Sequence, residues 1–243
     1  MNTIKGIIFD YGGTIDTNGI HWGEFIWEQY QKVGIDITRD VYREAYVYGE
    51  RFLAKNPVIE PCDTFHTLLR KKIAIHFDFL RNRMPEKQFD NEVAETIADG
   101  CYNKVKETLA TSRAIVEQLS KQYPMVLVTN FYGNMPVVLK EFGLAGYFKC
   151  IVESSIVGIR KPDPALFALG VDALQLPAEE IVVIGDSYRK DIYPSSTLGC
   201  KTIWLKNICW EEEPIADGHA PTAIIGSIEQ VTDVISALQS KEP

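Results

Sequence analysis

Short apolar runs recur along this chain, and each is rich in isoleucine, valine or leucine. The runs span residues 4–9, 125–129, 150–152, 181–184, 202–205 and 223–225. Each is about as long as a buried strand. Segments of helical length separate the later runs, at residues 112–120, 134–142, 164–174 and 227–238. This alternation predicts βαβ units and a parallel sheet with helices on both faces.

The first two runs do not follow this alternation of strands and helices, because well over a hundred residues separate Phe9 from Met125. Such a gap predicts an insertion. Within it, apolar and aromatic residues recur at helical spacing over residues 22–33, 38–53, 63–80 and 85–102, with breaks at Gly34, Pro57 and Pro61. We therefore predict a four-helix insert at residues 17–106, joined to a core made of residues 1–16 and 107–243.

Composition and charge narrow the class of ligand. The 243 residues are 46% hydrophobic and 24% charged, as in an ordinary globular domain, and the formal net charge is -8. An acidic chain is a poor partner for nucleic acid, whose phosphates require clustered Lys and Arg. The apolar runs are far shorter than the roughly 18 residues of a membrane span. We therefore expect a small-molecule ligand, and neither a nucleic-acid nor a membrane partner.

The five cysteines bear on the compartment in which the protein works. They are odd in number, include no CxxC pair and follow no N-terminal secretion signal. We therefore expect reduced thiols and a cytoplasmic location. A chain of this length can bury a sizeable hydrophobic core without disulfides.

Chemically distinctive residues gather where the predicted strands end. In an open parallel sheet, ligands bind beyond the carboxyl ends of the strands, so these residues are candidates for one site. They belong to the sequences FDYGGT, VLVTNF, GIRKPDP and IGDSYRKD, and they are Asp10, Gly12, Gly13, Thr14, Thr129, Asn130, Lys161, Asp186 and Asp191. Taken singly, each has an ordinary structural interpretation as a strand-exit turn, a surface lysine or a solvated loop. Their order along the chain indicates a shared function.

In this order, the residues resemble the motifs of the haloacid dehalogenase (HAD) superfamily, and in particular of its members with a helical cap inserted after the first motif. The resemblance covers nearly the whole chain. It implies an α/β fold, with a Rossmann-like parallel sheet core and the inserted four-helix cap. It also implies a hydrolase, because most members are Mg2+-dependent phosphatases that act on small phosphorylated molecules through an aspartyl-phosphate.

The resemblance also implies how the nucleophile and the metal would be held. Asp10 would be the nucleophile and Lys161 its counter-charge. Mg2+ would be bound by Asp10, Asp186 and the main-chain carbonyl of Gly12, with Asp191 in support. These roles are chemically consistent, because a carboxylate attacks a phosphate anion only when a cation and an ammonium group reduce their repulsion. Mg2+ prefers such oxygen ligands.

The phosphate would be bound from two sides in this family. Gly13 has no side chain, so its backbone can approach a phosphate closely. The Thr129 hydroxyl and the following Asn130 amide would donate hydrogen bonds from the opposite side. Gly13, Thr129 and Asn130 are therefore the expected substrate-binding residues.

The first motif departs from the family pattern at one position. The phosphatase pattern is DxDxT, in which the second aspartate protonates the leaving group and later activates water. Here the motif is Asp10-Tyr11-Gly12-Gly13-Thr14, so this acid/base is missing. A general acid is typically worth about 100- to 10,000-fold in rate. The nearest titratable residues that could replace it are Asp16 and His21.

Several functions are compatible with this departure. We favour a phosphatase that is weakened, or restricted to good leaving groups, by the missing acid. A 2-haloacid dehalogenase is one alternative, since halide leaves without a proton, although those enzymes are metal-free and lack the acidic pair at residues 186 and 191. A non-catalytic protein that binds a phosphorylated ligand is another. A phosphonate-cleaving enzyme would need a cap lysine, for which Lys55 is available. The substrate itself is not encoded in any motif.

Overall fold

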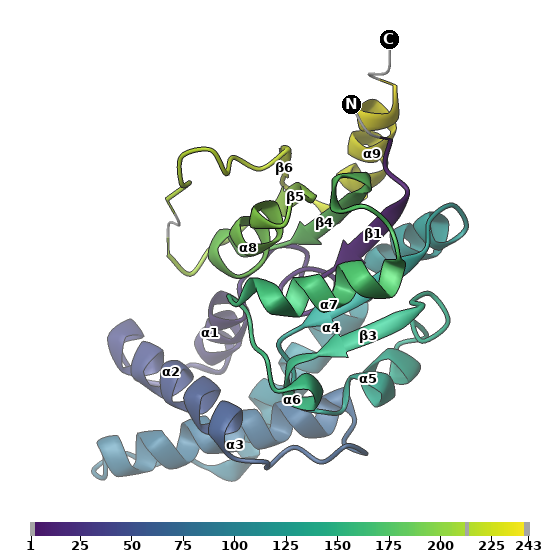
Figure 1. The fold of residues 1–243 in the computed structure, drawn as a ribbon. Coiled ribbons are helices and arrows are strands. Elements are labelled where there is room, and N and C mark those ends of the chain that lie inside the picture. The colour runs from purple at the N-terminus through teal and green to yellow at the C-terminus, as the bar shows by residue number, and fades with distance from the viewer. Residues whose placement is uncertain (1–2, 212–213, 241–243) are drawn as a thin grey trace.

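The centre of the molecule is a six-stranded parallel sheet. The computed structural model describes residues 3–211 and 214–240, and the strands follow the order β3-β2-β1-β4-β5-β6 (Figure 1). Every neighbouring pair is parallel. The strands are β1 (Gly6–Phe9), β2 (Met125–Thr129), β3 (Cys150–Glu153), β4 (Ile181–Gly185), β5 (Lys201–Leu205) and β6 (Ala223–Ile225). The predicted α/β fold with a parallel sheet is confirmed.

Helices cover both faces of this sheet, because successive strand residues point to opposite faces. Ile7 and Phe9 of β1 face one hydrophobic cluster, whereas Ile8 between them faces another. The first face is covered by α4 (Asn91–Ser120), α5 (Met135–Glu141) and α9 (Val231–Gln239). The other is covered by α7 (Pro164–Leu174), which lies in front of the sheet in Figure 1, and by α8 (Tyr193–Thr197). The short helix α6 (Ser154–Val157) follows β3.

The insertion between β1 and β2 is helical, as predicted. It contains α1 (Trp22–Val33), α2 (Arg39–Lys55), α3 (Phe65–Arg83) and the first part of α4, and Figure 1 shows these helices grouped beside the sheet. Local signals set the helix ends. The side chains of Thr38 and Thr64 cap α2 and α3, and α1 ends at Gly34, whose φ of 72° favours glycine. Buried aromatic rings pack the helices together.

Helix α4 differs from the expectation of two separate helices at residues 85–102 and 112–120. The structure has one helix of 30 residues, because buried positions continue through residues 101, 105, 109, 112 and 116. The expected boundary between cap and core at residue 106 therefore falls inside α4, and the division into cap and core stays a prediction. Despite its length, α4 carries recurring charges, and none of the described helices has the apolar stretch that a membrane crossing requires.

Candidate active site

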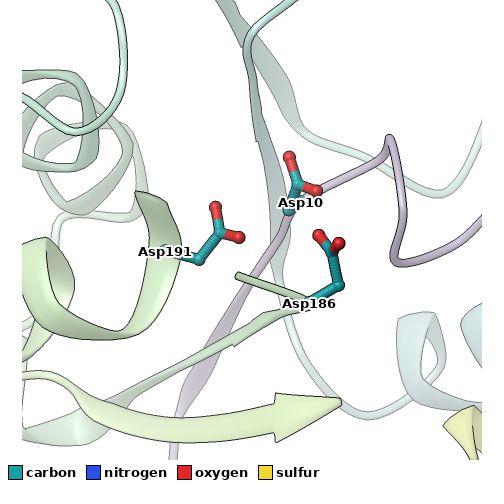
Figure 2. A group of neighbouring side chains, drawn as sticks. All are labelled: Asp10, Asp186 and Asp191. Atoms are coloured by element: carbon teal, nitrogen blue, oxygen red, sulfur yellow. The ribbon is translucent and has the colours of Figure 1, made fainter. Parts of the chain in front are cut away.

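Three buried or half-buried carboxyl groups meet where β1 and β4 end. Asp10 follows β1, and its N–H donates to the carbonyl of Ile184 in the neighbouring β4 at 2.9 Å. Asp186 follows β4, and Asp191 lies one turn later. Figure 2 shows the three carboxyl groups around a common space, and one oxygen from each lies within 4.8 Å of the others. The predicted convergence of these strand-end residues is thus present.

A π-helical turn positions Asp191. The segment Tyr188–Ile192 winds more widely than an α-helix, and the N–H groups of Asp191 and Ile192 both donate to the Ser187 carbonyl, at 2.9 and 3.3 Å. The Asp191 carboxylate in turn accepts a hydrogen bond from the Ser187 N–H at 3.1 Å. This turn, which no local sequence signal predicted, directs a residue five positions after Asp186 back into the site.

Lys161 is buried between two of the carboxylates. Its Nζ donates to Asp10 Oδ1 at 2.6 Å and to Asp191 Oδ1 at 2.7 Å. Asn130 holds the backbone at this residue, because its Oδ1 accepts from the Lys161 N–H at 2.9 Å and its Nδ2 donates to the Lys161 carbonyl at 3.2 Å. The Asn130 side chain therefore positions Lys161, and the expected donation from Asn130 to a phosphate stays a prediction.

The site has more negative than positive charge. Burial outweighs the effect of Lys161 and raises the pKa of Asp10 to about 6. Burial, together with the charges of Asp191 and Asp10, raises the pKa of Asp186 well above its usual range. Three carboxyl groups against one ammonium group, with only oxygen donors, match the preference of a hard divalent cation such as Mg2+. The residues present therefore fit the expected metal.

The backbone at Gly13 can accommodate only glycine. Its φ is 97°, and a Cβ atom there would lie 2.3 Å from Asp186 Oδ2. The Gly13 N–H donates to Asp16 Oδ1 at 2.7 Å, within the loop, and its contact with a phosphate stays a prediction. Next to it, the Thr14 hydroxyl donates to Asp10 Oδ2 at 3.1 Å. These contacts fix the conformation of the first motif and the loop that follows it.

Gly12, by contrast, is not required by the backbone. Its φ lies outside the left-handed region. A Cβ atom at this position would find its nearest neighbour, Trp22 Nε1, at 3.9 Å. Gly12 also lines the cavity that contains Asp10. A Cβ atom therefore has room there, and neither the backbone conformation nor a clash at Cβ explains the absence of the family's second aspartate.

Asp16 and His21, the two candidates to replace the missing acid, each lack one property of a general acid: Asp16 lacks access to the cavity, and His21 lacks a suitable pKa. Burial raises the pKa of Asp16 to about 7, a suitable value for a proton donor. However, Asp16 is fully buried, and its Oδ2 accepts a hydrogen bond from Trp22 Nε1 at 3.0 Å. His21 does line the cavity, but burial lowers its pKa to about 3. Its Nδ1 accepts from the Gly23 N–H at 3.0 Å, so the imidazole is neutral at pH 7.

A cavity of about 130 Å3 lies over Asp10 and is lined by residues of the sheet edge and of the inserted helices. Two charged residues of the insertion line it, Glu50 of α2 and Lys72 of α3, whose charged groups lie 2.7 Å apart. Lys190, from the π-helical turn, lines the same cavity. No sequence motif predicted these three residues. Polar residues within otherwise apolar helix faces were the available signal for Glu50 and Lys72.

Lys72, and not Lys55, is the cap lysine inside the cavity. Lys55 is exposed at the end of α2. Burial alone would lower the pKa of Lys72, but its contact with Glu50 raises it instead. Because a Schiff base forms from the neutral amine, this raised pKa argues against the phosphonate-cleaving alternative.

Comparison with known proteins gives consistent matches. A family model described as haloacid dehalogenase-like hydrolase matches residues 4–193, and a related model matches residues 158–231. A phosphoglycolate phosphatase of Photobacterium profundum is 30% identical over 239 residues, which cover 96% of each chain. A phosphoglycolate phosphatase of Pectobacterium atrosepticum is 36% identical over 125 residues, or 49% of each chain, so this match spans about half of that relative.

A solved structure extends the match to the whole fold. A HAD-hydrolase from Bacillus subtilis, solved with bound magnesium, has a TM-score of 0.59 and 18% sequence identity. The alignment covers 96% of this chain and 99% of that one. At this identity, the likeness concerns the fold alone.

Proposed function

Because the chain belongs to the haloacid dehalogenase-like hydrolase family, we propose that it is a Mg2+-dependent phosphatase of a small phosphorylated metabolite. The contact of the buried Lys161 ammonium group with the carboxylates of Asp10 and Asp191, at 2.6 and 2.7 Å, is the observation that carries this proposal. Asp186 completes an oxygen-only donor set beside them. The phosphatase relatives support the same reaction class.

In the proposed reaction, a carboxylate oxygen of Asp10 attacks phosphorus and the bond from phosphorus to the leaving oxygen breaks, which forms an aspartyl-phosphate. Lys161 orients Asp10 and offsets the charge on the phosphate, and Asp191 holds Lys161 in place. Bound at Asp10, Asp186 and the Gly12 carbonyl, Mg2+ would neutralise part of the phosphate charge. Water then attacks phosphorus, and inorganic phosphate leaves while the Asp10 carboxylate is regenerated.

Binding of the phosphate and departure of the leaving group involve the rim of the cavity. We assign the hydroxyl of Thr129, which lines the cavity at the end of β2, to the phosphate oxygens. At Gly12 there is no acid to protonate the leaving group. Neither Asp16, which is fully buried, nor His21, which is neutral, combines access with a suitable pKa. We therefore propose that the enzyme is restricted to good leaving groups.

We propose that residues 17–106 act as a cap that closes over the substrate. The cap contributes Trp22, Glu50 and Lys72 to the cavity lining, opposite Asp10 on the core. Closure would exclude water from the reacting groups and bring these cap side chains to the substrate.

One observation, the absence of an acid at Gly12, also favours the 2-haloacid dehalogenase and non-catalytic alternatives. A screen of phosphorylated metabolites, p-nitrophenyl phosphate and 2-haloacids, with Mg2+ and with EDTA, separates the three functions. We expect hydrolysis of phosphate esters that EDTA abolishes. Metal-independent release of halide would favour the dehalogenase, and tight binding of a phosphorylated metabolite without turnover would favour the non-catalytic protein.

Replacing Asp186 with asparagine is expected to weaken Mg2+ binding by at least about tenfold, because one charged oxygen ligand is lost. Calorimetric titration of the parent and of Asp186→Asn measures the effect. Asp172→Asn is the matched control, since Asp172 is exposed on α7. Equal affinities for the parent and Asp186→Asn would show that the metal site lies elsewhere.

Mg2+ binding is also expected to depend on pH. Because the pKa of Asp10 is raised to about 6, protons compete with the cation below that pH, and the affinity falls as the pH decreases. We expect a loss of at least about tenfold between pH 7 and pH 5, since one competing proton costs about tenfold per pH unit below the pKa. Calorimetry across this range checks the prediction, and an affinity that is constant from pH 5 to pH 8 would contradict it.

A further inference from the structure

Four basic residues line the cavity over Asp10, and they differ in how their charges are balanced. Lys161 contacts two carboxylates, and Lys72 contacts Glu50 at 2.7 Å. Arg160 is exposed, and its guanidinium donates to the Ser154 hydroxyl at 3.4 Å. Lys190 is half-buried and forms no ion pair within residues 3–211 and 214–240. Lys190 is therefore a cavity cation with no ion-pair partner among these residues, although its charge acts at longer range on Glu50 and Asp186.

Lys190 lines both this cavity and a wider opening beside it, which Tyr46, Glu50 and Arg51 of α2 border and which Asp10 and Thr129 do not line. After burial, its charge is the largest influence that lowers the pKa of His21. It also helps to lower the pKa of Glu50, another cap residue. The phosphate-binding end, by contrast, is at Asp10 and Thr129, where β1 and β2 stop. An anion held by Lys190 would thus belong to the part of a substrate that leaves with the alcohol oxygen.

From this arrangement, and resting on the proposed phosphatase function, we propose that the substrates are small phosphate monoesters that carry a carboxylate, and that Lys190 binds this carboxylate. A single ammonium group matches a monoanion. Asp10, Thr129 and Lys190 line one cavity of about 130 Å3, so a short tail can reach from the phosphate to Lys190. A carboxylate on that tail supplies the required charge.

The mouth of the cavity has the same sign of charge. Arg51, Arg160, Arg189 and Lys190 line the wider opening, of about 660 Å3, together with the acidic residues Glu50, Asp186 and Glu211. A basic entrance on a chain with a net charge of -8 attracts anions toward the site and raises their association rate. The entrance therefore favours the same class of substrate as Lys190 does.

Non-hydrolysable phosphonates test the carboxylate site separately from catalysis. 3-Phosphonopropionate has the carboxylate, and propylphosphonate has a methyl group in its place. By calorimetry with Mg2+, we expect the parent to bind 3-phosphonopropionate about 10- to 100-fold more tightly, as for a charge-assisted hydrogen bond in a partly desolvated site. Lys190→Gln should reduce this ratio to near one and leave propylphosphonate binding within about twofold. Lys190→Arg should retain most of the preference, as should Lys55→Gln, which changes an exposed lysine.

Different outcomes separate the carboxylate site from the phosphatase function. Equal affinities of the parent for the two phosphonates, no binding of either, or a Lys190→Gln variant that keeps the preference would each overturn the carboxylate site, even in an active phosphatase. Equal weakening of both ligands by Lys190→Gln would also overturn it, because Lys190 would then bind the phosphonate end or act on the fold. A preserved preference without hydrolysis of any phosphate ester would instead contradict the phosphatase and leave the carboxylate site supported.

Discussion

The Asp10→Asn variant is expected to lose at least about 10,000-fold in kcat/KM for phosphate esters while remaining folded, since removal of a covalent nucleophile leaves only binding and orientation. The amide cannot form the acyl phosphate. The fold should tolerate the change, because asparagine has the shape of aspartate and can still accept a hydrogen bond from Lys161. It also removes a buried carboxyl group whose pKa is already raised by burial, so the melting temperature of the metal-free protein should not fall.

Steady-state kinetics with p-nitrophenyl phosphate and Mg2+, together with thermal melts in EDTA, measures both parts of this prediction. Asp172→Asn controls for the loss of an acidic group elsewhere on the surface. Mass spectrometry of acid-quenched parent enzyme should show phosphorylation at Asp10. A variant that retains more than a few per cent of the parent's activity would mean that another group is the nucleophile.

Introducing the missing carboxylate, as Gly12→Asp, is expected to raise the rate on alkyl phosphates by about 100-fold or more, the usual value of a general acid. An alkoxide is a strongly basic leaving group that needs a proton, whereas a nitrophenolate does not. The rate on p-nitrophenyl phosphate should therefore change much less, and the dependence on leaving-group pKa should become shallower. The backbone accepts the substitution, because the φ of Gly12 lies outside the left-handed region and the nearest atom to its Cβ is Trp22 Nε1 at 3.9 Å, and the position lines the cavity.

Hydrolysis of the aspartyl-phosphate, the second half of the reaction, should also be faster in Gly12→Asp. In the parent, water attacks the aspartyl-phosphate without a general base, so rapid-quench kinetics with an aryl phosphate should show a burst of product. Gly12→Asp should remove the burst. Gly12→Asn is the matched control, because it has the same size and no acid, and it should behave as the parent does.

Equal rates of the parent on alkyl and aryl phosphates would contradict the absence of a proton donor. A parent enzyme that hydrolyses alkyl and aryl phosphates equally fast, with chemistry rate-limiting, would mean that it already has a proton donor. Asp16→Asn and His21→Gln are then the variants to compare, since Asp16 has the raised pKa and His21 has access to the cavity.

The strands and several helices could be predicted from local sequence signals. Residues 125–129, 164–174 and 22–33 form the expected elements with the expected ends. In α7, for example, Asp163 caps the helix and Pro164 begins it, and both signals are readable from neighbouring residues alone. The boundary between the two helices expected at residues 85–102 and 112–120 was wrong, because packing on both the cap and the core extends α4 through the intervening polar residues.

The sheet and the residues at its carboxyl edge follow from the amino-acid sequence, because hydrophobic periodicity and strand exits are properties of adjacent residues. Asp10, Lys161, Asp186 and Asp191 could therefore be identified from their motifs. The roles of their neighbours depend on the folded chain: Asn130 holds Lys161, and Lys190 lines the cavity without an ion-pair partner among the described residues. Both features depend on how segments far apart in the chain pack together. No local pattern of residue types encodes that packing.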